Sequence, residues 1–164
     1  MRKHLSILFI VAGLAGMIFS TSCTKLEDET SSSSMSKATI KGEALANLDL
    51  SNDTNATGGF EIQLEKVPNG TTVFARINSM DLDPNPNVQI DYQDITFQVT
   101  VENGEYEVEV YAGKGNVDVK LITDQFEYNQ KINDSTREMK VFTHVDENVV
   151  VINNQIKFVE LLFN

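Results

Sequence analysis

From Ala38 to the C-terminus, apolar and polar residues alternate in short runs, and this period of two restricts the fold more than any other feature. Successive side chains of a strand point to opposite faces, so such runs predict strands with one buried and one solvated face. The clearest inward-facing sets are Ile95, Phe97, Val99 and Val101; Tyr106, Val108 and Val110; and Val117, Val119 and Leu121. Further strands are predicted at residues 39–46, 60–65, 71–78 and 139–145, the last with Met139, Val141, Thr143 and Val145 on one face.

Turn-forming residues separate these runs. Asn103-Gly104 is the strongest hairpin signal, because both central residues of a type I′ turn need positive φ. A second hairpin is predicted around Asn153-Asn154, between residues 149–152 and 155–163. No stretch after residue 37 has a sustained helical period. Short strands at this spacing predict an all-β domain over residues 38–164, an antiparallel β-sandwich.

Part of this domain resembles a known family. Gly104, Tyr106, Ala112 and Gly113, within residues 101–121, stand where carboxypeptidase-regulatory-like, or prealbumin-like, domains carry a Gly-x-Tyr strand and an Ala-Gly turn, and the opening ATIKGEA resembles their first strand. The resemblance covers about 30 residues and implies a prealbumin-like sandwich that serves as a non-catalytic module of exported proteins. The 79–94 segment is longer than is usual there, and an immunoglobulin-like sandwich is the alternative.

Residues 1–22 have the pattern of a signal peptide. Arg2 and Lys3 precede an apolar run at 5–19, which is shorter than the roughly 20 residues that a transmembrane helix needs. Thr21-Ser22-Cys23 resembles the lipobox of Bacteroidetes-type surface lipoproteins, although Ser20 stands where leucine is usual. The resemblance implies cleavage before Cys23, acylation of Cys23 by palmitate or a similar chain, and anchoring in a lipid bilayer. An ordinary secretory signal with an incidental cysteine is the alternative.

Residues 23–37 have the composition of a flexible tether, with Glu27-Asp28-Glu29 followed by Ser31–Ser34. An acidic triplet close behind the cysteine resembles the signal that sends such lipoproteins to the outer face of the outer membrane. The sequence therefore predicts an outer-membrane protein displayed at the cell surface. A plain charged linker, with the domain on the periplasmic face, is the alternative.

The charge of the chain restricts its partners. The full chain has a net charge of −11, and removal of Arg2 and Lys3 with the signal leaves −13. Proteins bind nucleic acid by neutralising phosphates with Lys and Arg, so no nucleic-acid partner is expected. Besides the lipid bilayer, the expected partners are a glycan or a protein at the cell surface.

No catalytic pattern emerges from the sequence. Without residues 1–22, His144 is the only histidine, its place in the alternation predicts exposure, and no Gly-x-Ser-x-Gly elbow accompanies it. With one cysteine in the chain, no zinc cluster and no internal disulfide can form. We therefore expect no enzyme activity and no cofactor.

Two polar segments, 79–94 and 123–136, are predicted as long loops, and rigid β domains commonly bind through such loops. Tyr92 in the first, and Phe126 and Tyr128 in the second, are predicted ligand-binding residues. Oxygen-bearing side chains recur at alternate positions of the first, so Asp81, Asp83 and Asp91 are candidate calcium ligands. This loop is not an EF-hand, because Pro86 takes the glycine position and Tyr92 the glutamate position.

Taken together, these features predict a surface-anchored, non-enzymatic β-sandwich for binding or adhesion. The alternative is a structural or accessory subunit of a glycan-uptake or fimbrial assembly at the cell surface.

Overall fold

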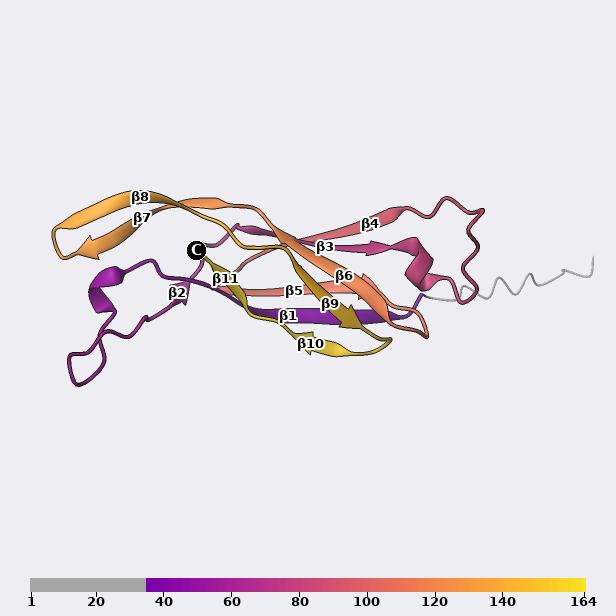
Figure 1. The fold of residues 1–164 in the computed structure, drawn as a ribbon, viewed down its shortest axis with the longest axis horizontal. Helices are drawn as coiled ribbons and strands as arrows, with labels where there is room; N and C mark the ends of the chain where they lie inside the picture. The colour runs from indigo at the N-terminus through magenta and orange to yellow at the C-terminus, as the bar shows by residue number, and fades with distance from the viewer. Residues whose placement is uncertain (1–34) are drawn as a thin grey trace, which may run out of the picture. The chain divides into compact units, whose positions relative to one another are not determined.

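The computed structural model describes residues 35–164. The predicted signal peptide, Cys23 and most of the predicted tether lie outside the described residues. The described part, hereafter the β domain, is built from strands and two short 3-10 turns and contains no α-helix, so the all-β prediction is confirmed (Figure 1). Within residues 35–164, no helix is long and apolar enough to cross a membrane.

The first sheet is built around β1 (Lys37–Ala46), which has partners on both edges. On one edge it pairs antiparallel with β5 (Glu105–Tyr111) and then with β2 (Glu65–Lys66). On the other edge it pairs parallel with β10 (Ile156–Phe158) and β11 (Leu161–Phe163), so the first and last strands of the β domain are neighbours.

The second sheet is antiparallel throughout, in the order β4 (Asp94–Thr100), β3 (Thr72–Asn78), β6 (Val117–Thr123) and β9 (Glu147–Val151). Between β6 and β9 the chain forms a separate two-stranded hairpin of β7 (Phe126–Asn133) and β8 (Thr136–Phe142). The 3-10 turns are η1 (Leu50–Asn52) and η2 (Ser79–Leu82).

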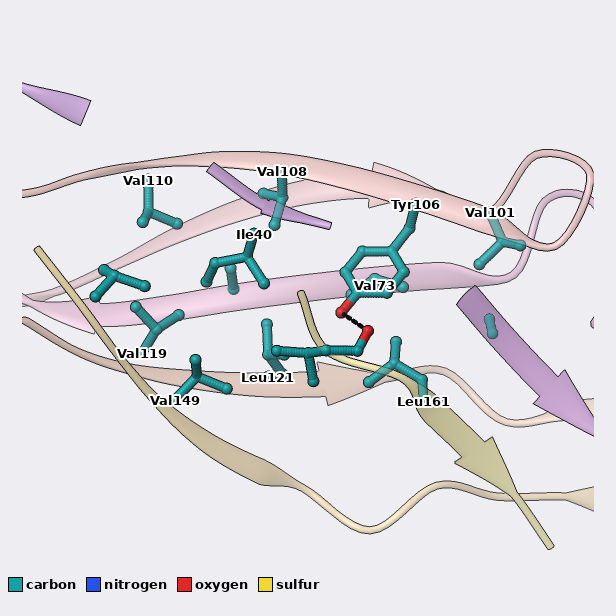
Figure 2. Close-up of a cluster of buried hydrophobic side chains, with 14 of the residues drawn as sticks. Ile40, Val73, Val101, Tyr106, Val108, Val110, Val119, Leu121, Val149 and Leu161 are labelled. Carbon is teal, nitrogen blue, oxygen red and sulfur yellow. Dashed lines mark hydrogen bonds between the residues drawn. The ribbon is translucent and has the colours of Figure 1, made fainter. Parts of the chain in front are cut away.

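One hydrophobic core joins the two sheets (Figure 2). Ile40, Val108 and Leu161 from the first sheet and Val119 and Leu121 from the second are all essentially inaccessible to water. The alternation of β4, β5 and β6 was interpreted in the correct register. Val108 and Val119 are buried, Val99 is half-buried, and Glu107 and Lys120 are exposed.

A close contact between strands fixes the end of the core. The Val159 carbonyl, between β10 and β11, occupies the space that a side chain at position 42 would fill, since a Cβ on Gly42 would lie 1.7 Å from that oxygen. Tyr106, which pairs with Gly42, donates its hydroxyl to the same carbonyl at 2.9 Å (Figure 2). The buried carbonyl therefore has the hydrogen bond that burial demands.

Both predicted turns form, but neither joins two paired strands of one sheet, as a hairpin does. Asn103 and Gly104 have positive φ, and Glu102 and Glu105 exchange two backbone hydrogen bonds, as a tight turn requires. The strands it joins nevertheless belong to different sheets, β4 to the second and β5 to the first. The C-terminal turn, with Asn154 at positive φ, likewise joins β9 of the second sheet to β10 of the first. Local alternation specifies the buried face of a strand and says nothing about which strand it pairs with.

Three further predictions were wrong. Of the strand predicted at 60–65, only Glu65 belongs to a strand, and residues 60–64 are exposed. The loop predicted at 123–136 is mostly β7. In β8 the faces are reversed, because Phe142 is buried whereas Met139 and Val141 are exposed.

Candidate binding site

Two ends of the β domain carry features outside the core. The cleft end is where Met35 and Ser36 precede β1, and the tip is the opposite end, where β1 leads into η1 beside the β7–β8 hairpin (Figure 1). The cleft end holds the residues predicted for calcium and one predicted ligand-binding tyrosine. The tip holds the other two aromatic residues predicted to bind a ligand.

An open cavity of about 840 Å³ lies at the cleft end. Met80, Leu82 and Pro86 from the 79–94 segment line one side, and Lys114 and Asn116 from the β5–β6 connection line the other. Apolar walls with a few polar groups can hold a small ligand.

Tyr92 does not face this cavity as a free ring. Its hydroxyl donates to Asp83 Oδ2 at 2.6 Å and accepts the Asn87 N–H at 2.9 Å, while Asn85 N–H donates to Asp83 Oδ1 at 2.8 Å. The Tyr92 hydroxyl and the Asn85 N–H hold the pKa of Asp83 below its usual range, and Asp83 raises the pKa of Tyr92. These bonds close the 79–94 segment on itself, which is a structural role.

The structure does not assemble the predicted calcium ligands. Asp83 is engaged by Tyr92, and Asp81 Oδ2 accepts the Asp118 N–H at 3.3 Å. Asp91 is exposed. Within residues 35–164, no three His, Cys, Asp or Glu side chains lie close enough together to hold a metal ion.

Phe126 and Tyr128 were predicted on a loop and lie on β7, half-buried against the core. The Phe126 ring stacks on Phe142, with centroids 5.2 Å apart and planes 10° apart, and lies 5.4 Å from the Phe163 ring. These contacts extend the core into the hairpin, so the two residues support the tip and do not form its surface.

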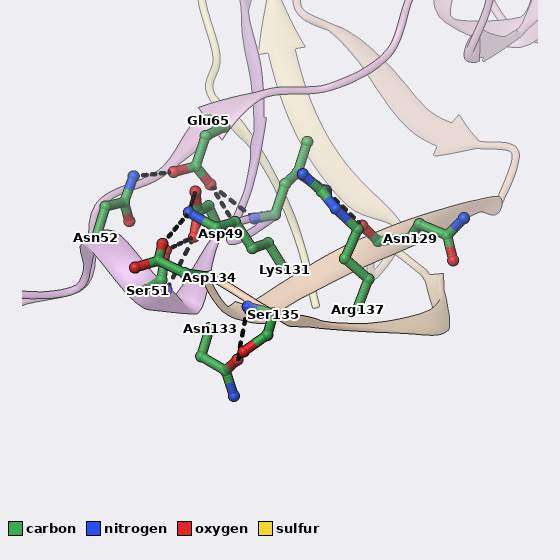
Figure 3. Close-up of polar contacts among 11 residues, drawn as sticks. Asp49, Ser51, Asn52, Glu65, Asn129, Lys131, Asn133, Asp134, Ser135 and Arg137 are labelled. Carbon is green, nitrogen blue, oxygen red and sulfur yellow. Dashed lines mark hydrogen bonds and ion pairs between the residues drawn. The ribbon is translucent and has the colours of Figure 1, made fainter.

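A polar network fastens η1 and its flanking residues to the hairpin (Figure 3). Glu65 Oε2 accepts the N–H groups of Leu48 and Asp49 at 2.7 and 3.1 Å, and its Oε1 accepts from Asn52 Nδ2 at 2.7 Å. Lys131 of β7 lies 3.4 Å from Asp49 Oδ2 and 3.2 Å from Asp134 Oδ1. The paired carboxylates raise the pKa of Lys131, and the Ser51 hydroxyl, which donates to Asp49, lowers the pKa of that carboxyl.

Asp53 connects this network to the segment that follows it. Its buried carboxylate accepts Asn47 Nδ2 and the Gln63 N–H, both at 2.8 Å, and its backbone carbonyl accepts the Glu61 N–H at 3.2 Å. Residues 54–60 form a tight hairpin between these contacts, with Gly58 at positive φ. The 60–64 segment is therefore held in place along one edge only.

The other edge of the 60–64 segment faces water. Phe60, Ile62 and Leu64 are 77%, 56% and 44% exposed. No hydrogen bond within the described chain uses the backbone N–H or C=O of Ile62 or Leu64. An extended edge with alternating apolar side chains and unpaired backbone groups is a template for another strand. The alternation of apolar and polar residues at 60–65 was visible in the sequence, but it led to the prediction of a strand packed on the core.

His144 differs from its prediction of exposure. It is half-buried, its ring lies 5.6 Å from the Phe163 ring, and its buried Nδ1 has no hydrogen-bond partner within residues 35–164. Burial lowers the pKa of His144, and the nearby Glu147 and Asp146 oppose that shift.

Comparison with known proteins found no similar sequence or structure: no family model matches the chain, and no curated protein or solved structure is significantly similar to it.

Proposed function

We propose that this protein is a lipid-anchored, surface-exposed, non-enzymatic module of the outer membrane that binds or adheres through the tip of its β domain. The observation that carries the proposal is the exposure of Phe60, Ile62 and Leu64 on a segment that is hydrogen-bonded to Asp53 along one edge. Exposed apolar residues that are held in place commonly mark interaction surfaces.

The position of the tip suits a surface module. If Cys23 carries the lipid, the chain reaches the β domain through Met35 at the cleft end. β1 then runs to the other end, where the hairpin and the 60–64 segment lie (Figure 1). Acylation at Cys23 thus leaves the tip as the end farther along the chain from the anchor.

The exposed side chains favour a protein partner over a glycan. Glycan sites commonly use exposed aromatic rings, and this chain has no Trp. Of the aromatic residues predicted to bind a ligand, Tyr92 is engaged by Asp83 and Phe126 packs on Phe142. Phe60 is an exposed ring, but it stands in a row with the aliphatic Ile62 and Leu64 beside an unpaired strand edge, which suits a polypeptide better than a sugar.

The same unpaired edge supports the second candidate, a structural or accessory subunit of a surface assembly, because assemblies can form by strand addition. We also propose the prealbumin-like β-sandwich as the fold type. Its support is the pairing of Gly42 with Tyr106, since both belong to the motif on which the resemblance rests.

The proposal is tested on intact cells. Fatty-acid labelling should mark the wild type and not Cys23→Ala, and external protease should remove the β domain without lysis. A triple replacement of Phe60, Ile62 and Leu64 by Ser should abolish adhesion to other cells or to matrix proteins. Val88→Ser, which changes a fully exposed apolar residue of the 79–94 segment, is the matched control. Protection of the domain until lysis, or unchanged adhesion of the triple variant, contradicts the proposal.

A further inference from the structure

We infer that the partner of the tip is a second copy of this chain, which pairs antiparallel with the first through the 60–64 segment. The inference rests on the proposed function and deepens it, because it names the partner and the register of contact.

The geometry of the segment leaves one edge for this pairing. The N–H groups of Glu61 and Gln63 point toward Asp53 and are bonded to it. Because successive backbone groups of an extended chain point to opposite edges, those of Ile62 and Leu64 face away from Asp53. The segment leads directly into β2, which pairs with β1, so an added strand would extend the first sheet at the tip.

The sequence of the segment, FEIQL, is complementary to itself in one register. With Ile62 opposite the partner's Ile62, Phe60 lies opposite the partner's Leu64. Directly opposed residues lie on the same face of a sheet, so six apolar side chains form one stripe. On the other face, Glu61 lies opposite the partner's Gln63, a pair without like charges.

The neighbouring registers are worse. A shift of one residue places apolar side chains opposite polar ones, which mixes the two faces. A shift of two in one direction opposes Glu61 to the partner's Glu61, and in the other direction opposes Glu61 to the partner's Glu65. Because like charges directly opposed are destabilising, the register centred on Ile62 is the one that the charges allow.

This pairing has a direction. β2 is antiparallel to β1, and β1 runs from the cleft end to the tip, so the 60–64 segment is directed from the tip back toward the cleft end. Antiparallel pairing about Ile62 makes the two β domains overlap at their tips and point in opposite directions. Such a contact can link copies that are anchored on two opposed membranes.

The contact is small, since a stable interface buries roughly 1,600 Å² and a five-residue strand pair buries far less. Each chain is also acidic, which opposes association at low salt. A single contact is therefore weak, and strong attachment requires many copies on each surface. A lipid-anchored protein meets that condition.

The test is vesicle clustering with the full-length lipidated protein. Wild-type vesicles should cluster with each other and not with protein-free vesicles. Vesicles carrying only Ile62→Asp, or only Ile62→Lys, should lose clustering at least tenfold, because like charges meet across the two-fold axis. Mixing the two populations should restore clustering, because Asp then faces Lys. Val88→Asp and Val88→Lys should cluster like the wild type.

The inference is overturned if wild-type vesicles cluster with protein-free vesicles, which indicates insertion into lipid. It is also overturned if the single Ile62 variants cluster undiminished, or if the mixture fails to recover. Absence of wild-type clustering also refutes self-pairing, whereas a protein protected from external protease on cells refutes surface display alone.

Discussion

Gly42 leaves the space that the Val159 carbonyl occupies, and Tyr106 supplies the hydrogen bond that this buried carbonyl needs. Because the two residues are cross-strand partners, the local geometry of the core depends on both. Each can be changed separately.

Gly42→Ala should destabilise the protein by about 1–3 kcal/mol, because its Cβ forces backbone atoms apart. Urea unfolding provides the measurement. Gly115→Ala is the matched control, since nothing lies within 4 Å of a Cβ there, and it should change stability by less than about 0.5 kcal/mol. Equal effects at the two positions would contradict the close approach of Val159.

Tyr106→Phe should cost about 1–3 kcal/mol, because it leaves the Val159 carbonyl buried without a donor. Tyr111→Phe removes the hydroxyl of a half-buried tyrosine that makes no hydrogen bond within residues 35–164, and should be nearly neutral. A neutral Tyr106→Phe would show that water or another donor reaches the carbonyl.

At the scale of elements, β8 and the η1 region form the tip by different means. β8 contributes Phe142 to an aromatic stack, whereas η1 and its flanking residues are held by the carboxylate of Glu65. One contact is apolar and the other polar, so they respond to different substitutions.

The register of β8 predicts a large asymmetry between neighbouring apolar residues. Phe142→Ala should destabilise by about 3–5 kcal/mol, since it leaves a cavity in the core, and Met139→Ala by less than about 0.5 kcal/mol. Thermal or urea unfolding of both variants checks this. A larger destabilisation by Met139→Ala than by Phe142→Ala would mean that the face predicted from alternation alone is the buried one.

Glu65→Ala should speed amide hydrogen exchange at Leu48 and Asp49, because both N–H groups lose their acceptor. Glu61→Ala, an exposed glutamate whose carboxylate forms no hydrogen bond within residues 35–164, should leave these amides unchanged. Equal protection in the two variants would show that backbone contacts alone hold the region.

For the whole molecule, the half-buried His144 couples stability to pH. The folded pKa of His144 lies below the ordinary histidine value of about 6.5, because burial disfavours the charged ring. The unfolded chain therefore takes up a proton first as pH falls, and unfolding becomes easier. The stabilisation is complete above about pH 7 and is lost as pH falls through 6.5 toward the lowered folded pKa.

We expect a lower free energy of unfolding at pH 5.5 than at pH 7.5, and a flatter profile for His144→Gln. Residues 35–164 contain no other histidine, and the lowered carboxyl pKa values of Asp49 and Asp83 act below about pH 4. An unchanged pH profile in the variant would assign the effect to another group.

Alternation alone determined the all-β class and the buried faces of β4, β5 and β6, because a side chain's face depends only on its position along its own strand. The turn at Asn103-Gly104 was equally predictable, since positive φ is a local property. These features require no knowledge of neighbouring strands.

Only the tertiary structure decided which strands pair, which face of β8 is buried and how the 60–64 segment is held. Met139 and Phe142 fit the same period in opposite phase, and it is Phe142 that is buried and stacks on Phe126. Tyr92 looked like an exposed ring until Asp83, nine residues away, engaged its hydroxyl. The 60–64 segment alternates as a core strand does, but Asp53 holds one of its edges and nothing in the described chain covers the other. Alternation shows where a strand could present an apolar face, because it depends only on the local sequence. Packing between distant segments determines whether that face is buried.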